Sequence, residues 1–257
     1  TGMLGSMVCD YLSVSFKKFK SEIEVIPITR KDYDILKDEP VKLERLLTKA
    51  SHTAHPKDVI INCAGIIKQR KEYTPLDFIK VNSLFPLALS QIAKEKSLYL
   101  IHISTDCVFN GEVHSYDVCL PYDEDSPPSA QDVYGMTKAL GEPKDCMVIR
   151  TSIIGEEKNN KLSLLEWVKS NKGKTINGYT NHLWNGVTTL TLAQFLEYTI
   201  SQKQYWKGIR HIISPEGTTK AKLIRDIDVV FNLGIKINYV KDTTIINRTL
   251  SSKYNTK

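Results

Sequence analysis

The residues of this chain that could carry out chemistry include one hydroxyl, one phenol and one ammonium group: Thr105, Tyr134 and Lys138. Tyr134 and Lys138 stand four positions apart, so on a helix both side chains lie on one face. A phenol has a pKa near about 10, which a neighbouring ammonium group lowers. Such a phenol can donate a proton to a carbonyl oxygen as a hydride reaches the carbonyl carbon, while a threonine hydroxyl holds that oxygen. These residue types therefore predict carbonyl reduction.

The position of Thr105 strengthens this interpretation. It follows an apolar run, residues 98–103, that has the pattern of a buried strand. Ser104, Thr105 and Asp106 then lie at the carboxyl end of the strand, where open α/β sheets bind their ligands. A tyrosine and a lysine four apart are also a common helix pair with no catalytic role. Their place about thirty residues after Ser-Thr-Asp favours catalysis.

The first residues contain two glycines three positions apart, ahead of a predicted helix and a predicted strand at 22–28. They match the later part of a G-x-x-G-x-x-G turn, in which glycines let the backbone approach a pyrophosphate and the following helix N-terminus stabilises its charge. The strand and the first glycine of such a turn are not in this sequence. The predicted cofactor contacts of the turn are Gly2, Met3, Leu4 and Gly5.

The end of the predicted strand at 22–28 indicates which nicotinamide cofactor is used. An acidic residue at this point binds a ribose 2′-hydroxyl, whereas an arginine suits a 2′-phosphate. Arg30 and Lys31 come first here, and Asp32 is one step further. We therefore predict NADPH, with NADH as the alternative.

Apolar runs without alternation, typical of parallel strands buried on both faces, occur at 58–65 and 147–155. Helical patterns at 36–50 and 76–94 alternate with the strands, which predicts a doubly wound parallel sheet of the Rossmann type. The first of these runs ends in small residues that leave room for an adenine or a nicotinamide ribose, so three further cofactor contacts are predicted: Cys63, Ala64 and Gly65.

The two predicted units are a Rossmann domain over residues 1–154 and a smaller C-terminal substrate lobe over 155–257. Segments near 180–212 are expected to return to the Rossmann domain. Residues 177–188 form a predicted polar and aromatic loop containing Trp184 and Asn185. Amides and aromatic rings suit a sugar, and they equally suit ordinary loop packing. Short helices at 162–169, 191–202 and 220–232 and a short strand at 211–215 complete the lobe.

Composition limits the classes of protein to consider. No apolar run approaches the roughly 20 residues of a membrane span. The five cysteines are scattered, without a disulfide or metal-ligand spacing, so we expect a reducing cytoplasm and no metal site. The net charge of +6 is spread along the chain without aromatic-basic interleaving, which favours anionic small molecules over nucleic acid.

Together, Ser-Thr-Asp-x-Val-Phe-x-Gly at 104–111, Tyr-Gly-x-x-Lys at 134–138 and Arg-Thr-Ser at 150–152 resemble the extended short-chain dehydrogenase/reductase family. Within it, the pattern is most similar to the dTDP-4-dehydrorhamnose reductases. The resemblance implies NAD(P)H reduction of the C4 ketone of a nucleotide-linked 4-keto-6-deoxy sugar, in deoxysugar biosynthesis for surface polysaccharide, by a protein that could form a homodimer. It implies these substrate contacts: Thr105, Asp106, Cys107, Ile153, Trp184 and Asn185.

Two residues depart from the pattern of those reductases, which usually have a tyrosine at the position of Cys107 and a tryptophan at that of Ile153. Both departures concern the sugar side. The related 4,6-dehydratases follow the threonine with Asp-Glu, and Cys107 after Asp106 disfavours that reaction. An epimerase is an alternative. So is a non-catalytic NADP-binding regulator resembling the regulatory subunit of methionine adenosyltransferase.

Overall fold

Four parallel strands form the central sheet of the computed structural model, which describes residues 2–19, 22–50, 58–113, 120–159 and 161–254. The strands are β1 (Val59–Asn62), β2 (Tyr99–Ile103), β4 (Met147–Arg150) and β9 (Gly208–His211), in the order β1-β2-β4-β9. Their carboxyl ends therefore meet at one edge of the sheet. Because β9 pairs with β4, the chain near residue 210 lies in the main sheet.

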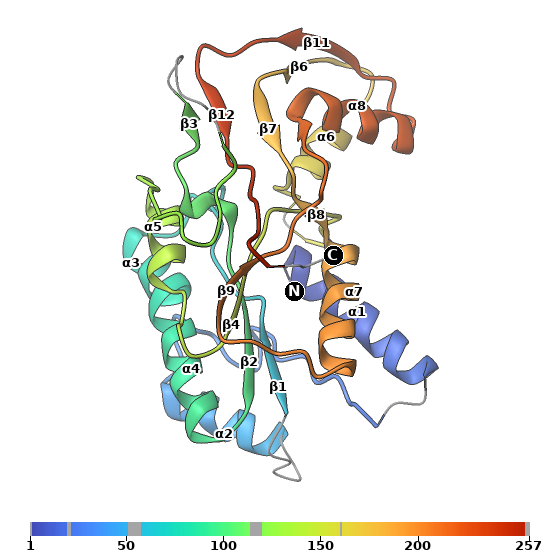
Figure 1. Cartoon of the computed structure of the whole chain (residues 1–257). Helices are drawn as coiled ribbons and strands as arrows, with labels where there is room; N and C mark the ends of the chain where they lie inside the picture. Colours follow the sequence, from blue (N-terminus) through green and yellow to red (C-terminus); the bar gives the residue numbers. More distant parts are fainter. Residues whose placement is uncertain (1, 20–21, 51–57, 114–119, 160, 255–257) are drawn as a thin grey trace.

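Helices cover both faces of this sheet (Figure 1). On one face α1 (Met3–Lys18) packs beside α7 (Thr189–Ser201), against alternate side chains of β2 and β4 such as Ile101 and Ile149. On the other face lie α2 (Pro40–Ala50) and α4 (Phe85–Glu95). Since parallel strands bury both faces, their apolar runs do not alternate. The predicted doubly wound α/β fold is confirmed.

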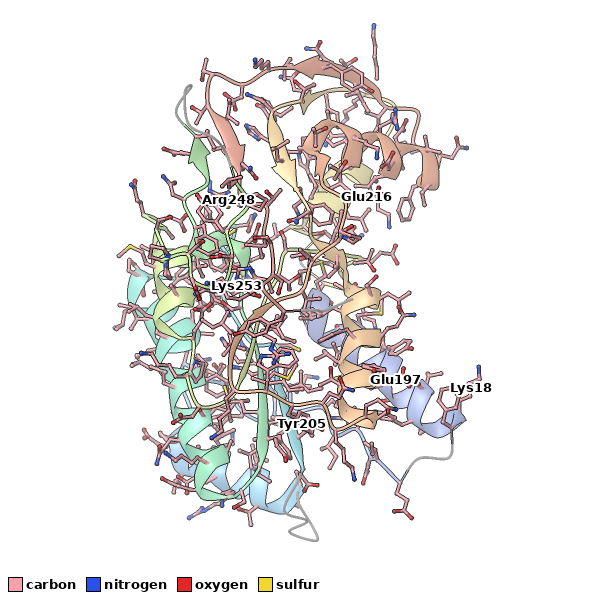
Figure 2. All side chains as sticks on the ribbon, viewed as in Figure 1. Lys18, Glu197, Tyr205, Glu216, Arg248 and Lys253 are labelled. Atoms are coloured by element: carbon pink, nitrogen blue, oxygen red, sulfur yellow. The ribbon has the colours of Figure 1, made fainter. Side chains whose placement is uncertain are left out.

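The two helices on the first face are also joined by polar contacts. Glu197 of α7, labelled in Figure 2, accepts hydrogen bonds from the Tyr11 hydroxyl (2.9 Å) and the Ser15 hydroxyl (2.7 Å) of α1. The first turn of α1 lies beside the carboxyl end of β1. A Cβ atom placed on Gly5 would be 3.6 Å from the Cβ atom of Cys63, which is ordinary contact distance.

The predicted strand at 22–28 is wrong: this segment is extended but belongs to no strand ladder. Its side chains are mostly exposed, although Val25 packs on the core formed with α1. β1 has a described partner on one side only, namely β2. A β-strand needs a neighbour for its backbone hydrogen bonds, and no described strand lies next to this segment to supply them.

One long helical segment, predicted at 76–94, is a run of three elements: α3 (Pro75–Phe78), the π-helical turn η1 (Ile79–Leu84) and α4. Pro86 near the start of α4 has no N–H to donate, which favours a local change of hydrogen-bonding pattern. The site helix α5 (Val133–Leu140) is capped by the Asp132 carboxylate, which accepts from the Gly135 N–H at 3.0 Å.

The second lobe lies beyond the carboxyl ends of the central strands (Figure 1). The predicted loop at 177–188 is wrong, because most of it forms short strands that pair with distant segments. The three helices predicted in this part of the chain are present. They are α6 (Leu164–Ser170), predicted at 162–169, α7, predicted at 191–202, and α8 (Lys220–Phe231), predicted at 220–232. The remaining elements are η2 (Asp106–Val108), β3 (Glu112–Val113), β5 (Ile153–Ile154), β6 (Thr175–Tyr179), β7 (His182–Trp184), β8 (Val187–Thr188), β10 (Thr218–Thr219), β11 (Lys236–Val240) and β12 (Ile245–Asn247).

Two observations concern the described residues alone. None of their helices is long and apolar enough to cross a membrane. They contain no group of three or more His, Cys, Asp or Glu side chains placed to hold a metal ion. Thr1, at the start of the glycine turn, and Cys119, one of the five cysteines, lie outside the described residues.

Candidate active site

The three residues predicted to be catalytic line one large cavity of about 2270 Å³, which extends along the length of β1 to the carboxyl ends of β1 and β2. Thr105 lies two residues after the end of β2, and Tyr134 and Lys138 lie on α5. The helix approaches the strand end closely because Gly135 has no side chain. A Cβ there would collide with the carbonyl oxygen of Cys107 and with Ala130. The glycine therefore brings the tyrosine beside it up to the threonine.

Thr105 is fixed by the turn that it begins. Its hydroxyl accepts from the Cys107 N–H (3.2 Å), which caps η2, and donates to the Asp106 carboxylate (3.1 Å). Asp106 is buried, and burial raises the pKa of its carboxyl group. Asp106 also donates its N–H to the Thr151 carbonyl at 3.2 Å. The hydroxyl is therefore held at a fixed point in the wall of the cavity.

Tyr134 is a proton donor in this environment. Removal from bulk water raises its pKa above the usual value, the thiol of Cys107 acts in the same direction, and a side-chain hydrogen bond with Thr105 opposes both. The raised pKa of this phenol is opposite in direction to the sequence prediction, in which a neighbouring ammonium group lowers it. The phenol is consequently protonated at neutral pH and can give its proton to a developing alkoxide.

Lys138 is almost completely buried and donates from Nζ to the Ile103 carbonyl oxygen at 2.8 Å. Burial lowers its pKa to about 8, and the Glu142 carboxylate opposes that change. This explains the difference for Tyr134: the ammonium group bonds to the strand end instead of to the phenol. At neutral pH the lysine carries a positive charge at the floor of the cavity.

The residues of the predicted cofactor turn line the same cavity: Gly2, Met3, Leu4 and Gly5, opposite Cys63, Ala64 and Gly65. Gly2 caps α1 without a side-chain hydrogen bond, so N–H groups of the first turn have no capping partner. These donors at the positive end of a 16-residue helix suit a pyrophosphate. Burial raises the pKa of the Cys63 thiol to about 12, so this side chain of the cavity lining is uncharged at neutral pH.

Of the two basic residues predicted to select the cofactor, Arg30 lines the cavity and the exposed Lys31 does not. Arg30 donates from Nη1 to the Tyr73 hydroxyl at 2.9 Å, and its guanidinium lies 5.8 Å from the centre of that ring. Arg70 approaches the same ring at 5.4 Å. Asp32 instead accepts from the N–H and hydroxyl of Thr29 within its own turn.

The predicted substrate contacts divide into two groups. Asp106, Cys107, Ile153 and Trp184 line the cavity, and Trp184 Nε1 donates to the Ser152 hydroxyl at 2.9 Å. Asn185 does not line it: its amide pairs with the backbone N–H (3.0 Å) and carbonyl (2.7 Å) of Leu250. These two hydrogen bonds join the segment around Asn185 to the backbone of Leu250. The side chain of Asn185 therefore stabilises the fold at this point.

Arg248 is a cavity residue that sequence reasoning missed. It follows β12 and lies where the second lobe meets the main sheet (Figure 2). Its Nε donates to the Phe109 carbonyl at 3.0 Å. Its charge opposes the rise that burial causes in the pKa of Asp106 and contributes to the lowered pKa of Asp132. Only the pairing of β12 with β3 and β7 brings this residue, more than a hundred positions away, to the site.

Curated relatives match parts of the chain. A protein named dTDP-4-keto-6-deoxy-D-glucose reductase, from Streptomyces niveus, is 31% identical over 136 residues, which are 50% of this chain and 43% of the relative. The dTDP-4-dehydrorhamnose reductase of Mycolicibacterium smegmatis is 29% identical over 158 residues, 59% of this chain and 42% of the relative. The chain spans about half the length of the curated relatives it matches.

Similar solved structures extend over nearly the whole chain. The structure of dTDP-4-dehydrorhamnose reductase from Bacillus anthracis in complex with NADP has a TM-score of 0.76 and 19% identity, and the match covers 99% of this chain and 86% of that one. The structure of the dTDP-4-dehydrorhamnose reductase from Clostridium acetobutylicum has a TM-score of 0.73 and 22% identity, and the match covers 94% of this chain and 81% of that one. At 19% and 22% sequence identity, the structural similarity shows that this chain shares the fold of these proteins.

A protein-family model supplies the assignment. The model described as "RmlD substrate binding domain" matches residues 1–240, which is most of the chain. The match contains the cofactor turn, the Ser-Thr-Asp strand end, the tyrosine and lysine of α5, and most of the second lobe. This chain belongs to the RmlD substrate binding domain family.

Proposed function

We propose that this protein uses NADPH to reduce the C4 ketone of a nucleotide-linked 4-keto-6-deoxy sugar in deoxysugar biosynthesis for surface polysaccharide. One observation carries the proposal: Thr105, Tyr134 and Lys138 line one cavity together with the first turn of α1. A hydroxyl, a protonated phenol and an open space beside a helix N-terminus are the parts that carbonyl reduction with a nucleotide cofactor needs. The names of the curated relatives, which are sugar-nucleotide reductases, support the same substrate class.

In this proposal the chain's own residues bind, orient and protonate. Bound NADPH would supply a hydride to the C4 carbon. Tyr134 gives its proton to the C4 oxygen, and the Thr105 hydroxyl turns its proton from Asp106 to that oxygen and donates a hydrogen bond to it. Lys138 provides a positive charge beside the nicotinamide ribose and the developing alkoxide. The products are an alcohol and the oxidised cofactor, and the phenol regains its proton from solvent.

The experiment that tests the proposal follows NADPH absorbance with a panel of nucleotide-linked 4-keto-6-deoxy sugars. We expect oxidation of NADPH with at least one of them and formation of the 4-hydroxy product. Binding of NADPH without oxidation across the panel would favour a non-catalytic regulator. Interconversion of sugar epimers without net consumption of NADPH would favour an epimerase.

The contacts of Arg30 lead to a prediction about cofactor choice. We expect Arg30→Ser to weaken NADPH binding by roughly tenfold and to leave NADH binding nearly unchanged, because a guanidinium pairs with the 2′-phosphate that only NADPH carries. Lys31→Ser is the matched control, since Lys31 lies outside the cavity and should have a smaller effect. Fluorescence titration with both nucleotides measures the two affinities. An equal loss for NADPH and NADH would contradict the assignment of Arg30.

Arg248 is proposed to bind the diphosphate of the substrate. Its guanidinium is a cation in the cavity wall near Asp106, on the side of the second lobe. We expect Arg248→Gln to raise the KM for the sugar nucleotide by roughly tenfold or more without changing NADPH binding. Arg225→Gln, on the exposed surface of α8, is the control. Unchanged KM in the Arg248 variant would place the diphosphate elsewhere.

The protein is also proposed to form a homodimer through the outer surface of α4, η1 and α5. Leu84, Leu87, Met136 and Leu140 are 42–67% exposed there, on elements that pack together. An apolar surface shared by two neighbouring helices suits a second copy of the same surface. Light scattering after size exclusion should give a dimer, and Leu87→Glu should give a monomer. Val229→Glu, on an exposed part of α8, should leave the mass unchanged.

The proposed place of this reaction is the cytoplasm. The described cysteines Cys9, Cys63, Cys107 and Cys146 are free thiols, as in proteins of reducing compartments. Burial raises the pKa of Cys107 to about 12, so the thiol in the substrate wall is protonated and a weak nucleophile.

A further inference from the structure

Glu142 is a buried carboxylate beneath the candidate active site, outside the set of residues assigned so far. Its Oε1 accepts from the Ser104 hydroxyl (2.6 Å) and from Arg150 Nε (2.8 Å), and its Oε2 accepts from Arg150 Nη2 (2.7 Å). The side chains of Arg150 and Glu142 are only 3% and 5% exposed. Burying such a pair costs free energy of desolvation, which these hydrogen bonds offset in part.

The contacts of Glu142 fall beside those of Lys138. Lys138 Nζ donates to the carbonyl of Ile103, and Glu142 accepts from the side chain of Ser104, the next residue. The end of α5 thus holds the two residues that directly precede Thr105. The helix end is itself fixed on η1, because a Cβ on Gly141 would collide with the backbone of Asn82.

We infer that Glu142 is a positioning residue, whose buried carboxylate is shared between Arg150 and Ser104 and holds the strand end at Thr105 against α5, beside Lys138. The inference rests on the proposed function for its catalytic consequence. When the nicotinamide ribose competes for the Lys138 ammonium group, the Ser104–Glu142 bond still holds the strand end. Thr105 and Tyr134 then keep the separation that a carbonyl oxygen between them requires.

The charges around Lys138 are consistent with this role. Cys63, from the end of β1, is a neutral thiol, because burial raises its pKa to about 12. His102, from β2, is a neutral imidazole, because burial lowers its pKa well below the usual value. Tyr134, on the same helix, is a neutral phenol. Glu142 is the acidic side chain among the influences on Lys138, and it opposes the effect of burial. Arg150, from β4, is the second buried cation of this network and is ion-paired with the same carboxylate.

Two variants separate the two parts of the inference. Ser104→Ala removes the bond to the strand end and keeps the ion pair. The double variant Glu142→Gln/Arg150→Met removes both charges together, so no unpaired ion is left in the core. For each we would measure kcat, the KM for NADPH and the pH profile of kcat. The pH dependence of the unfolding free energy is measured in parallel and needs no substrate.

We expect Ser104→Ala to lower kcat roughly tenfold with little change in the KM for NADPH and no shift of the pH profile. The double variant should also move the basic limb of the profile to lower pH by more than about half a unit, because Lys138 loses its proton more easily without the carboxylate. Wild-type kcat in Ser104→Ala, or an unshifted profile in the double variant, would overturn the corresponding part of the inference.

The unfolding measurements distinguish a failure of this inference from a failure of the proposed reaction. In the double variant, the pH range over which stability depends on Lys138 should begin at lower pH than in the wild type. If the wild type reduces no sugar nucleotide but this shift is present, the proposed reaction fails and the link between Glu142 and Lys138 stands. If the shift is absent, the link fails whatever the activity.

Discussion

Tyr134→Phe is expected to lower turnover by about 10³-fold while NADPH binding stays within twofold of the wild type, an effect in the range of general-acid catalysis. The variant keeps the aromatic ring and removes the hydroxyl that would donate the proton. Burial raises the pKa of this phenol and keeps its proton available at neutral pH. Steady-state kinetics and a cofactor titration on the same preparation measure both quantities.

The control is Tyr239→Phe, which changes an exposed residue of β11 far along the second lobe and should leave the rate unchanged. Equal unfolding midpoints for both variants would show that any loss of rate is local. If Tyr134→Phe kept more than about a tenth of the wild-type rate, the phenol would not be the acid, and Lys138 or water would have to supply the proton.

Lys138→Met is expected to stabilise the protein near neutral pH and to abolish most of the activity. The folded-state pKa of Lys138 is lowered to about 8 from 10.5, so the unfolded chain binds more protons between those pH values. The stability of the wild type therefore rises with pH across this window and, below pH 8, carries the full cost of burying the charge. The difference amounts to about 3 kcal/mol at most.

Urea unfolding of the wild type and the variant, at intervals from pH 7 to pH 10.5, measures this effect. The free energy of unfolding of Lys138→Met should exceed that of the wild type at pH 7, and the two curves should converge as the pH rises. Lys144→Met, a change outside the buried network, is the control. Parallel curves over the whole range would show that Lys138 is not the group whose protonation is linked to folding.

Much of the fold could be predicted from the sequence because three of the four central strands carry their own signal. The runs ending at Asn62, Ile103 and Arg150 are apolar on both faces, and helices separate them, so this part of the parallel sheet follows from local pattern. The fourth strand, β9, shares only His211 with the strand predicted at 211–215. The meeting of three predicted catalytic residues in one cavity could be predicted from local pattern too. Thr105 is marked by the end of a strand, and Tyr134 and Lys138 by helical spacing.

The errors occurred where structure depends on partners distant in the sequence. Residues 22–28 have strand-like composition but no neighbour to pair with, and residues 177–188 look like a loop yet pair with β11 and β12. Arg248 was missed because nothing beside it marks a ligand. Asn185, predicted to contact the sugar, is not among the residues that line the cavity and binds the backbone of Leu250. Register between distant strands is not visible in a local pattern.

The electrostatics of the site could not be predicted either. The spacing of Tyr134 and Lys138 indicates a shared helix face, but it does not say where each polar head finds its partner. The carbonyl of Ile103 binds the ammonium group, and the desolvation of both side chains dominates their pKa values. Desolvation depends on the whole fold, so a sequence motif alone gives the wrong direction for the phenol.

The one-sided pairing of β1 has a consequence for the dynamics of the sheet. Val59–Asn62 bond to β2, and no described strand covers their other side, whereas β2 and β4 have neighbours on both sides. Because β2 and β4 are hydrogen-bonded on both sides, their amide hydrogens should be the last of the central sheet to exchange with deuterium.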